Sequence, residues 1–387
     1  MSDTKTLDSQ FIAHTYNRFD LEIVSGKGEI VQDDKGNSYI DMATGIAVNT
    51  FGHADSVWVD AVTKQINSFA HTSNLYYSRP CARLAQVLCN RTGMSKVFFS
   101  NSGAEANECA IKAARQWAAV NKGPEYYTII TLVNSFHGRT ITTLAATGQD
   151  VFHKDFLPLT EGFVYAPAND IEAIKELISQ HNVAAVMFEP VQGEGGVNPL
   201  CKDYVAQLAK LAEENNILLV CDEVQTGNGR TGKLYGYMHY GIEPDIVSTA
   251  KGLAGGLPIG ATLFGAKTAD VYGPSMHGST FGGNPVSCAA ALSIIDRIDD
   301  ALLKEVTEKS EYIKSEFEGC EGIKSVTGLG FMLGIETEKP AGDVVKECMA
   351  KGVLVITAKT KVRLLPPLNI TWDNLKKAVE TIKEVCR

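Results

Sequence analysis

Positive charge is in short supply in this sequence. Its 387 residues include 36 Lys plus Arg against 45 Asp plus Glu, a formal net charge of −9. That balance disfavours long-range attraction to nucleic acid or anionic lipid, so no nucleic-acid partner is expected. No apolar run approaches the ~18 residues of a membrane span. The start, MSDTKTLDSQ, lacks the basic flank and apolar core of a signal peptide. We therefore expect a cytoplasmic protein without a membrane anchor.

Paired cysteines are also absent. The nine cysteines occur singly, no CxxC pair is present, and the total is odd. This pattern suggests neither a zinc cage nor a disulfide framework, and no metal site is predicted. Reduced thiols in a cytoplasm fit the pattern best.

Repeats, low-complexity stretches and charge blocks are missing, so the chain divides by its elements and not by linkers. Between residues 97 and 264, short apolar runs alternate with helical stretches. Runs without polar alternation indicate strands buried on both faces, and hence an α/β fold with a mainly parallel sheet between helices. The runs are Val97 to Phe99, Thr128 to Val133, Val183 to Phe188, Ile217 to Cys221, Ile246 to Ser248 and Thr262 to Phe264.

Beyond Asn284 the pattern changes to amphipathic helices and spaced strands, which indicates a smaller α+β domain. The expected strands are Phe331 to Ile335, Val353 to Ile356 and Val362 to Leu365. A hairpin over Glu29 to Asp41 has no place in a parallel sheet and is expected to join that smaller domain. The predicted division is an N-terminal segment 1–50 belonging to the small domain, a large domain 51–285 and the C-terminal part of the small domain 286–387.

In an open parallel sheet, ligand chemistry gathers beyond the carboxyl ends of the strands. The segment Ser100 to Asn107 follows one strand and begins a helix. The free backbone N–H groups at the start of that helix could bind a phosphate. An ordinary N-capped helix would explain the same residues equally well. The GKS or GKT of a Walker loop is absent, as is GxGxxG at this turn. Asp222-Glu223 lies at the end of another strand. A buried aspartate in that position needs a cationic side chain, a metal ion or a protonated nitrogen as its partner. Alternatively, Asp222 caps the next turn.

Lys251 follows a buried strand and precedes Gly252-Leu253-Ala254-Gly255-Gly256. A lysine in that position is partly desolvated, which favours a neutral amine able to form an imine. Most lysines are solvated surface charges, so the position alone would not mark it as catalytic.

Four other segments offer polar groups with open alternatives. Phe136 and Arg139 share a loop and could stack on a planar ligand and bind a carboxylate, or serve as a core ring and a surface charge. Ser279 and Thr280 lie in a glycine-rich loop suited to phosphate or to plain turns. Arg363 is a charge inside a strand and needs an anion, either a structural partner or a substrate carboxylate. Glu194 could pair with an arginine, although solvated loop carboxylates are more common.

Taken together and in this order, these segments resemble the class III aminotransferases that use pyridoxal 5'-phosphate (PLP), most closely their acetylornithine branch. The resemblance covers nearly the whole chain and implies the type I fold of PLP-dependent transferases. Its most specific parts are Cys221 to Gly227, Gly229 to Lys233, and Pro244-Asp245-Ile246 leading to Lys251, which stands 29 residues after Asp222.

The resemblance implies a role for each of these residues. Lys251 would bind PLP covalently and later shuttle a proton, and Asp222 would keep the pyridinium nitrogen protonated. Arg139 and Arg363 would bind the carboxylates of the amino donor and of 2-oxoglutarate, and Glu194 would neutralise an arginine when the donor needs only one. The other implied cofactor contacts are Ser102, Gly103, Ala104, Phe136, Glu223, Val224, Gln225 and Thr280 from the neighbouring subunit of a homodimer, with Ser279 beside the substrate.

The implied reaction transfers the terminal amino group of N2-acetylornithine to 2-oxoglutarate, as in arginine biosynthesis. Gly45 stands where the ornithine branch tends to carry tyrosine and leaves room for an N-acyl group. Alternatives within the family are ornithine, succinylornithine, 4-aminobutyrate and succinyl-diaminopimelate aminotransferases. A PLP-binding regulator, a nicotinamide oxidoreductase and an aminomutase are alternatives of other classes. Ala104 replaces a frequent threonine, and Ala54-Asp55-Ser56 departs from the usual His-Pro.

Overall fold

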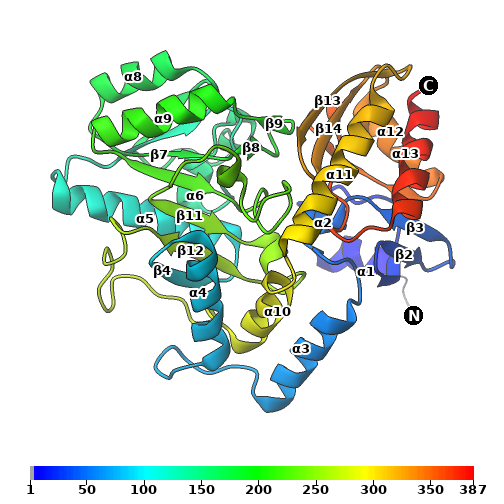
Figure 1. The fold of residues 1–387 in the computed structure, drawn as a ribbon, viewed down its shortest axis with the longest axis horizontal. Coiled ribbons are helices and arrows are strands. Elements are labelled where there is room, and N and C mark those ends of the chain that lie inside the picture. Colours follow the sequence, from blue (N-terminus) through cyan, green and yellow to red (C-terminus); the bar gives the residue numbers. More distant parts are fainter. Residues whose placement is uncertain (1–3) are drawn as a thin grey trace.

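The computed structural model describes residues 4–387, and a sheet of seven strands forms its larger part (Figure 1). The strand order is β4-β12-β11-β10-β7-β5-β6, and only β12 pairs antiparallel with its neighbours. The strands are β4 (Lys96–Ser100), β5 (Thr128–Leu132), β6 (Phe163–Ala166), β7 (Val183–Phe188), β10 (Leu218–Asp222), β11 (Ile246–Thr249) and β12 (Gly260–Phe264). The predicted α/β fold with a mainly parallel sheet is confirmed. Strand β6 was not expected from the sequence, and it is an edge strand that is only partly buried.

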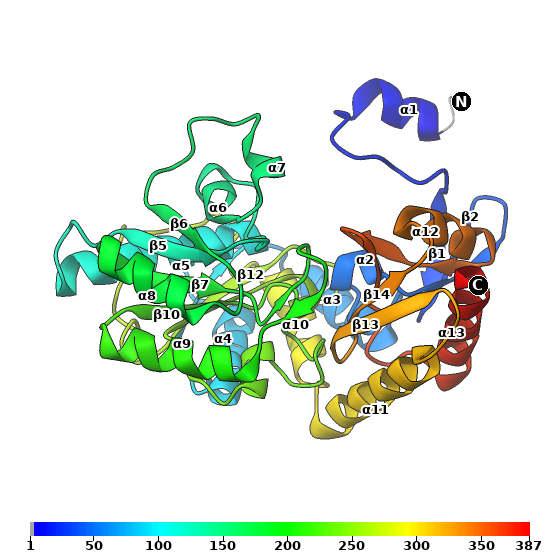
Figure 2. The same cartoon turned by 90° about the horizontal axis from the view of Figure 1, so that it is seen from above.

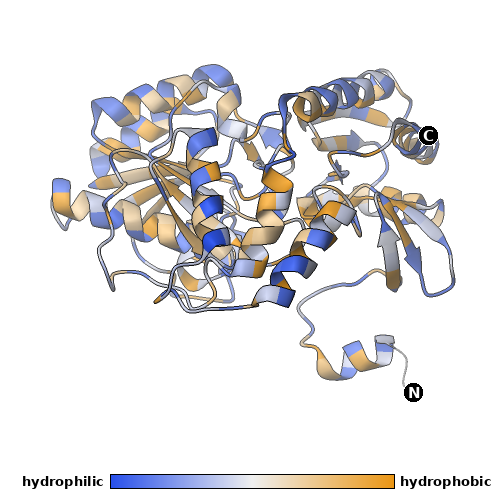
Figure 3. Cartoon of the chain, turned by 60° about the horizontal axis from the view of Figure 1, so that its bottom comes forward, coloured by the Kyte–Doolittle hydropathy of each residue, from blue (hydrophilic) through white to orange (hydrophobic). Residues whose placement is uncertain are grey.

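Strand β10 shows why the apolar runs lack polar alternation. Leu218 and Val220 pack into the core under α5 (Gly103–Asn121), whereas Leu219 and Cys221 pack into the core on the other face, with Leu208 of α9 (Lys202–Glu214). Successive side chains of a strand point to opposite faces of the sheet. A strand that helices cover on both faces must therefore be apolar throughout. Figure 3 shows the resulting apolar interior and the polar outer faces of the helices.

Helices cover both faces of this sheet, and shorter elements connect them (Figure 2). The helices are α3 (Ser56–Ser68), α4 (Arg79–Thr92), α6 (Ile141–Ala146), α7 (Asp150–His153), α8 (Ile171–Gln180) and α10 (Pro285–Ile295), with two 3₁₀ turns, η1 (Gly236–His239) and η2 (Lys251–Leu253), and a two-stranded ribbon of β8 (Val191–Gln192) and β9 (Asn198–Pro199). Within residues 4–387, no helix combines the length and apolar character needed to cross a membrane.

The second part of the molecule holds two four-stranded sheets, in the orders β13-β14-β17-β16 and β1-β2-β3-β15. β3 pairs in parallel with β15, and Ile40 and Met42 share a core with Leu333 and Leu364, so the N-terminal hairpin lies against the C-terminal part. The elements are α1 (Thr4–Phe11), β1 (Ile23–Lys27), β2 (Ile30–Asp33), β3 (Ser38–Asp41), α2 (Thr44–Ala47), α11 (Asp300–Phe317), β13 (Ile323–Leu329), β14 (Met332–Thr337), α12 (Ala341–Ala350), β15 (Val353–Leu354), β16 (Ile356–Ala358), β17 (Lys361–Leu364) and α13 (Trp372–Cys386).

Two boundaries differ from the sequence-based expectation. The run Val353 to Ile356 is divided at Val355 between two different sheets. Helix α10 packs into the larger core through Ala291 and Ile294, and that core continues to Ile298. The change from one core to the other therefore falls after Ile298, later than the proposed limit at 286. The physical reason is that α10 rests on α3 and α4, which belong to the large part.

The unusual segment Ala54-Asp55-Ser56 has a structural explanation. Asp55 is the N-cap of α3, where its Oδ1 accepts a hydrogen bond from Trp58 N at 2.9 Å. The same carboxylate pairs with both terminal nitrogens of Arg297, at 3.0 and 2.8 Å. Arg297 follows α10, so one aspartate both starts α3 and ties it to the neighbouring helix.

We expect Asp55→Ala to lower the free energy of unfolding by about 1–2 kcal/mol, because the helix loses its cap and the chain loses a partly exposed ion pair. The midpoint of urea unfolding would measure the effect. Asp55→Asn is the matched control, since it keeps the capping oxygen and should be closer to wild type. Equal losses in both variants would contradict a role for the cap.

Candidate active site

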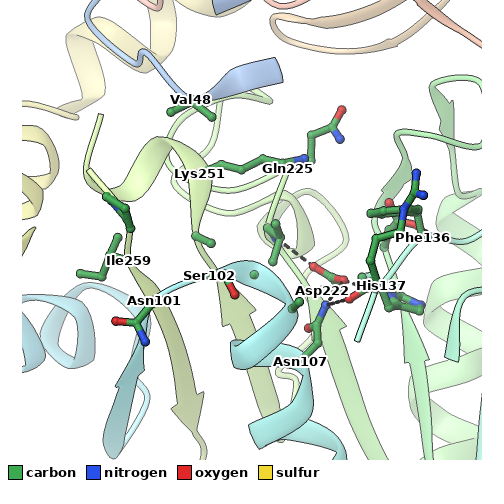
Figure 4. Close-up of a pocket in the computed structure, with 18 of the residues that line it drawn as sticks. Val48, Asn101, Ser102, Asn107, Phe136, His137, Asp222, Gln225, Lys251 and Ile259 are labelled. Carbon is green, nitrogen blue, oxygen red and sulfur yellow. Dashed lines mark hydrogen bonds and ion pairs between the residues drawn. The ribbon is translucent and has the colours of Figure 1, made fainter. Parts of the chain in front are cut away.

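A cavity of about 420 Å³ opens at the carboxyl ends of the parallel strands (Figure 4). Its lining comes from the segments that follow β4, β5, β10 and β11, and from Val48 in the N-terminal part. These positions are where an open α/β sheet gathers its ligand-binding groups. Of the residues singled out from the sequence, those lining the cavity are Ser102, Gly103, Ala104, Phe136, Arg139, Asp222, Val224, Gln225 and Lys251.

Asp222 ends β10 as a buried carboxylate held by three donors. Its Oδ2 accepts hydrogen bonds from Asn107 Nδ2 at 2.7 Å and from His137 Nδ1 at 2.8 Å, and its Oδ1 accepts one from Val224 N at 2.9 Å. A carboxylate offers about four acceptor positions, so capacity remains for one more donor from the cavity. The arrangement fixes the direction of the carboxylate and leaves it suited to a protonated nitrogen.

Lys251 begins η2 on the same cavity, with its backbone in the left-handed region at φ +43°. Such a conformation is uncommon outside glycine and is typical of functional sites, where the surroundings hold the strain. Burial lowers the pKa of the Lys251 amine, an effect that the Glu194 charge opposes. Within residues 4–387 the amine has no hydrogen-bond or ion-pair partner. It is therefore available as a nucleophile.

The start of α5 offers a cradle for an anion. Ser102 is the N-cap, and its hydroxyl accepts a hydrogen bond from Glu105 N at 3.1 Å. The N–H groups of Gly103 and Ala104 fall in the first turn, where they have no partner within the helix. A Cβ at Gly103 would lie 2.6 Å from Val224 Cγ1, so only glycine lets α5 approach the end of β10 so closely. The helix dipole adds to the attraction for a phosphate.

Phe136 and Arg139 form an aromatic and cationic wall. The Arg139 guanidinium lies over the rings of Phe136 and Phe152, at 5.6 and 4.3 Å from their centroids. The Phe136 ring meets the Phe152 ring edge-on. Arg139 is exposed, so it can reach a ligand carboxylate at the cavity mouth while its stem remains packed on the aromatic rings.

Arg363 lies on β17, in the second part of the molecule, and pairs with Glu194 from the loop after β8. The distances are 2.6 Å from Nη1 to Oε1 and 3.3 Å from Nη2 to Oε2. Burial by itself raises the pKa of Glu194, but Arg363, Lys251 and Gln225 together lower it by more, so the pKa lies below its ordinary value. Gln225 joins the pair, because its Oε1 accepts from Arg363 Nη1 at 3.0 Å and its amide donates to Glu194 at 3.3 Å. Arg363 Nε is buried and has no hydrogen-bond partner within the part of the chain that the structure describes.

Ser279 and Thr280 lie in the loop before α10 and do not line the cavity. Ser279 Oγ accepts hydrogen bonds from Asn101 Nδ2 at 3.2 Å and from Gly282 N at 2.9 Å, which ties the loop to the start of α5. Thr280 is exposed.

Glu223 faces away from the cavity. Its carboxylate accepts hydrogen bonds from Thr226 Oγ1 at 2.6 Å, from Gly236 N at 2.8 Å and from Tyr237 N at 2.6 Å, and so organises the turn after β10. The prediction that Glu223 contacts the cofactor therefore rests on the resemblance alone.

Among the cavity residues to which no role was assigned from the sequence, three hold other parts of the site in place: Asn107, His137 and Glu189. Asn107 and His137 hold Asp222, as described above. Glu189 follows β7 and accepts hydrogen bonds from Phe136 N at 2.9 Å and from Gly193 N at 3.2 Å. It thus fixes both the loop of the aromatic wall and the loop that carries Glu194. Its signal in the sequence was its position at the end of a continuous apolar strand.

The fold and the site together define a PLP-dependent enzyme. An unpartnered amine, a carboxylate suited to a ring nitrogen, an aromatic wall and a helix N-terminus match the aldehyde, pyridine nitrogen, ring and phosphate of PLP. The chain belongs to the family described as aminotransferase class-III, whose model matches residues 11–386. Class III aminotransferases are PLP-dependent transaminases, so this chain is one of them.

Known relatives cover almost the entire chain. It is 48% identical to an acetylornithine aminotransferase of Haemophilus ducreyi, over 98% of both chains. Its fold is similar to that of N-acetylornithine aminotransferase from Stenotrophomonas maltophilia, with a TM-score of 0.86 and 33% identity over 98% of this chain and 97% of that one. The ornithine aminotransferase of Toxoplasma gondii, seen with partial occupancy of PLP at its active site, has a TM-score of 0.94 and 32% identity over 99% and 93%.

We expect Glu189→Gln to make stability less sensitive to pH. Burial raises the pKa of Glu189 to about 7, from 4.5 for the free side chain, with Asp222 adding to the increase and His137 opposing it. Between these values the folded chain keeps a proton that the unfolded chain has released, so stability falls as pH rises. Glutamine removes this decline, which amounts to at most about 1.4 kcal/mol per pH unit.

Urea unfolding of wild type and Glu189→Gln across that pH range measures the difference in slope. Glu194→Gln is the matched control, because the pKa of Glu194 is lowered and its replacement should not flatten the slope. Parallel slopes in wild type and Glu189→Gln would show that Glu189 does not titrate in this range.

Proposed function

We propose that this enzyme transfers the terminal amino group of N2-acetyl-L-ornithine to 2-oxoglutarate, giving N-acetyl-L-glutamate 5-semialdehyde and L-glutamate, as a step of arginine biosynthesis. The observation that carries the proposal is the match, over nearly the full length, to an acetylornithine aminotransferase at 48% identity. Gly45 agrees with it: a Cβ there would meet nothing closer than 3.8 Å, so the site of a tyrosine in the ornithine branch is open.

Each of these cavity residues has its own role in the proposed reaction. When bound, PLP supplies a protonated pyridine ring that withdraws electrons from the substrate carbon bearing the amino group. Asp222 holds the proton on the ring nitrogen. Lys251 binds the cofactor through Nζ and, once Nζ is free, that atom takes the proton from the substrate carbon and returns it. Ser102, Gly103 and Ala104 bind the phosphate.

Two arginines bind the carboxylates of the substrates. Both 2-oxoglutarate and glutamate carry two carboxylates, whereas the acetylated donor carries one next to its amide. Arg139 binds the carboxylate common to both reactants, and Arg363 binds the second carboxylate of 2-oxoglutarate. With the amino donor, Arg363 stays paired with Glu194, as in the observed ion pair, so no buried cation is left without a partner.

A homodimer completes the active sites in this proposal. Thr280 is exposed, and the loop carrying it is joined to the segment 70–77 by Asn74 Nδ2, which donates to Ser279 O and Gly282 O at 3.1 and 3.0 Å. That segment exposes Leu75, Tyr76 and Tyr77, with exposed fractions of 87%, 70% and 107%. A contiguous apolar surface of this kind favours burial against a second copy. The nine free thiols fit a cytoplasmic location.

Initial rates with different amino donors test the assignment. We expect N2-acetylornithine to give the highest kcat/KM with 2-oxoglutarate, above ornithine, succinylornithine, 4-aminobutyrate and succinyl-diaminopimelate. Ornithine is the second candidate, because the Toxoplasma gondii ornithine aminotransferase has a TM-score of 0.94. Equal or faster turnover of free ornithine would contradict the acetylornithine assignment, and no turnover without 2-oxoglutarate is the expected control.

We expect Lys251→Ala to lose the visible absorption band of lysine-bound PLP and to lower turnover by several orders of magnitude, because no other amine lines the cavity within the described part of the chain. Absorption spectra and single-turnover rates measure both effects. Lys251→Arg, which keeps the charge without the nucleophile, should fail in the same way. Asp222→Ala should bind PLP weakly and lack activity. Full activity in Lys251→Ala would remove Lys251 from the reaction.

A further inference from the structure

Arg230 is a buried arginine that does not line the cavity. It is 3% exposed, and within residues 4–387 no carboxylate forms an ion pair with it. Its Nη1 donates hydrogen bonds to two backbone carbonyl oxygens, that of Phe331 at 3.3 Å and that of Pro366. Burying a cation costs free energy unless hydrogen bonds replace those it made to water. The two carbonyls are therefore the partners that account for an arginine at this position.

The two carbonyls lie at the end of one β-ladder. Strands β14 and β17 pair antiparallel with Leu333 opposite Leu364, and the same register extended by two positions places Phe331 opposite Pro366. Proline has no backbone N–H, so the ladder cannot continue through it. Phe331 N donates instead to Arg230 O at 2.8 Å. Arg230 thus ends the ladder through both its guanidinium and its own carbonyl.

Arg363 lies on the ladder that Arg230 ends. It stands opposite Gly334, three residues before Pro366. The turn after β10, which carries Arg230, holds Arg363 a second time, because Gln225 Oε1 accepts from Arg363 Nη1 at 3.0 Å. A single turn of the larger part therefore fixes both the strand and the guanidinium that this strand carries.

The same turn is also attached beside Lys251. Asn228 Nδ2 donates to Thr249 Oγ1 at 3.0 Å and to Ala250 O at 3.2 Å, and Ala250 directly precedes Lys251. One short turn thus sets the position of Arg363 relative to Lys251, although the two residues belong to different parts of the molecule.

We propose that Arg230 is a positioning residue that holds Arg363 in place for the second carboxylate of the oxo-acid substrate. This inference rests on the proposed function, in which Arg363 binds 2-oxoglutarate but stays paired with Glu194 when the amino donor is bound. Arg230 acts through Arg363, since it does not line the cavity. Loss of Arg230 frees the end of the ladder, so binding of a dicarboxylate weakens more than binding of a monocarboxylate.

The test compares two probes of equal length, the dicarboxylate glutarate and the monocarboxylate pentanoate, by calorimetric titration of the PLP-loaded protein. We expect Arg230→Met to weaken glutarate binding about tenfold and to leave pentanoate binding within about twofold of wild type. The KM for 2-oxoglutarate should rise in parallel, whereas the half-reaction with the amino donor alone should change by less than about twofold.

Arg230→Lys should have the same selectivity with a smaller effect, because lysine keeps the charge on a side chain that is one atom shorter. It also supplies the comparison if Arg230→Met does not fold. The matched control is Lys309→Met. Lys309 is a buried cation of the smaller core that donates to Ile370 O and pairs with Glu305 at 2.6 Å, away from the β14–β17 ladder. We expect this variant to lower the midpoint of urea unfolding without changing glutarate binding.

Three results would overturn the proposal: equal weakening of both probes, an effect of the same size in Lys309→Met, or unchanged glutarate binding in the folded Arg230 variants. Failure of the proposed function is recognised separately in the wild type. If the wild-type protein binds glutarate no more tightly than pentanoate, the role of Arg363 itself is wrong, and the role of Arg230 is wrong with it.

Discussion

The structure depends above all on one buried negative charge, the Asp222 carboxylate at the end of a strand enclosed on both faces. Burying such a charge costs free energy unless hydrogen-bond donors surround it. Asn107 from α5, His137 from the loop after β5 and the backbone of Val224 supply these donors, from three separate segments. Satisfying one carboxylate therefore fixes the start of a helix, the aromatic wall and the turn after β10 relative to each other. The cavity lies between these three segments.

Backbone strain is concentrated beside the same cavity. Thr44, Gly45, Ile46 and Ala47 have φ values of 51°, 64°, 66° and 62°, a left-handed turn that costs roughly 1–2 kcal/mol for each residue with a side chain. Asp41 holds its start by accepting hydrogen bonds from Ala43 N and Thr44 N, at 2.9 and 2.8 Å. The turn ends at Val48 in the cavity wall, and Thr50 Oγ1 donates to Gly252 O at 2.7 Å, next to the strained Lys251. The N-terminal segment thus supports the backbone beside Lys251, the residue that is proposed to carry the chemistry.

The two parts of the molecule meet in the Arg363–Glu194 pair, which spans 169 positions in sequence. Because one partner comes from each part, a change in their relative position would alter the pair. Within residues 4–387, one buried nitrogen of the guanidinium lacks a hydrogen-bond partner, and the group is further held by Gln225, a cavity residue. Under the proposed function, this arrangement would connect binding of the second carboxylate of a substrate to the packing of the smaller core on the larger one.

The sequence by itself determined the sheet apart from its edge strand β6, the positions of Lys251 and Asp222 at strand ends, and the helix that begins after Ser102, because burial pattern and capping chemistry are local properties of the chain. It also placed the hairpin, whose turn residues are contiguous. Tertiary structure alone decided which of the adjacent carboxylates, Asp222 or Glu223, faces the cavity, since neighbouring side chains at a strand end point to opposite sides. It likewise decided that Glu189 holds two loops and that α10 belongs to the larger core. These partners are distant in the chain, and only packing brings them together.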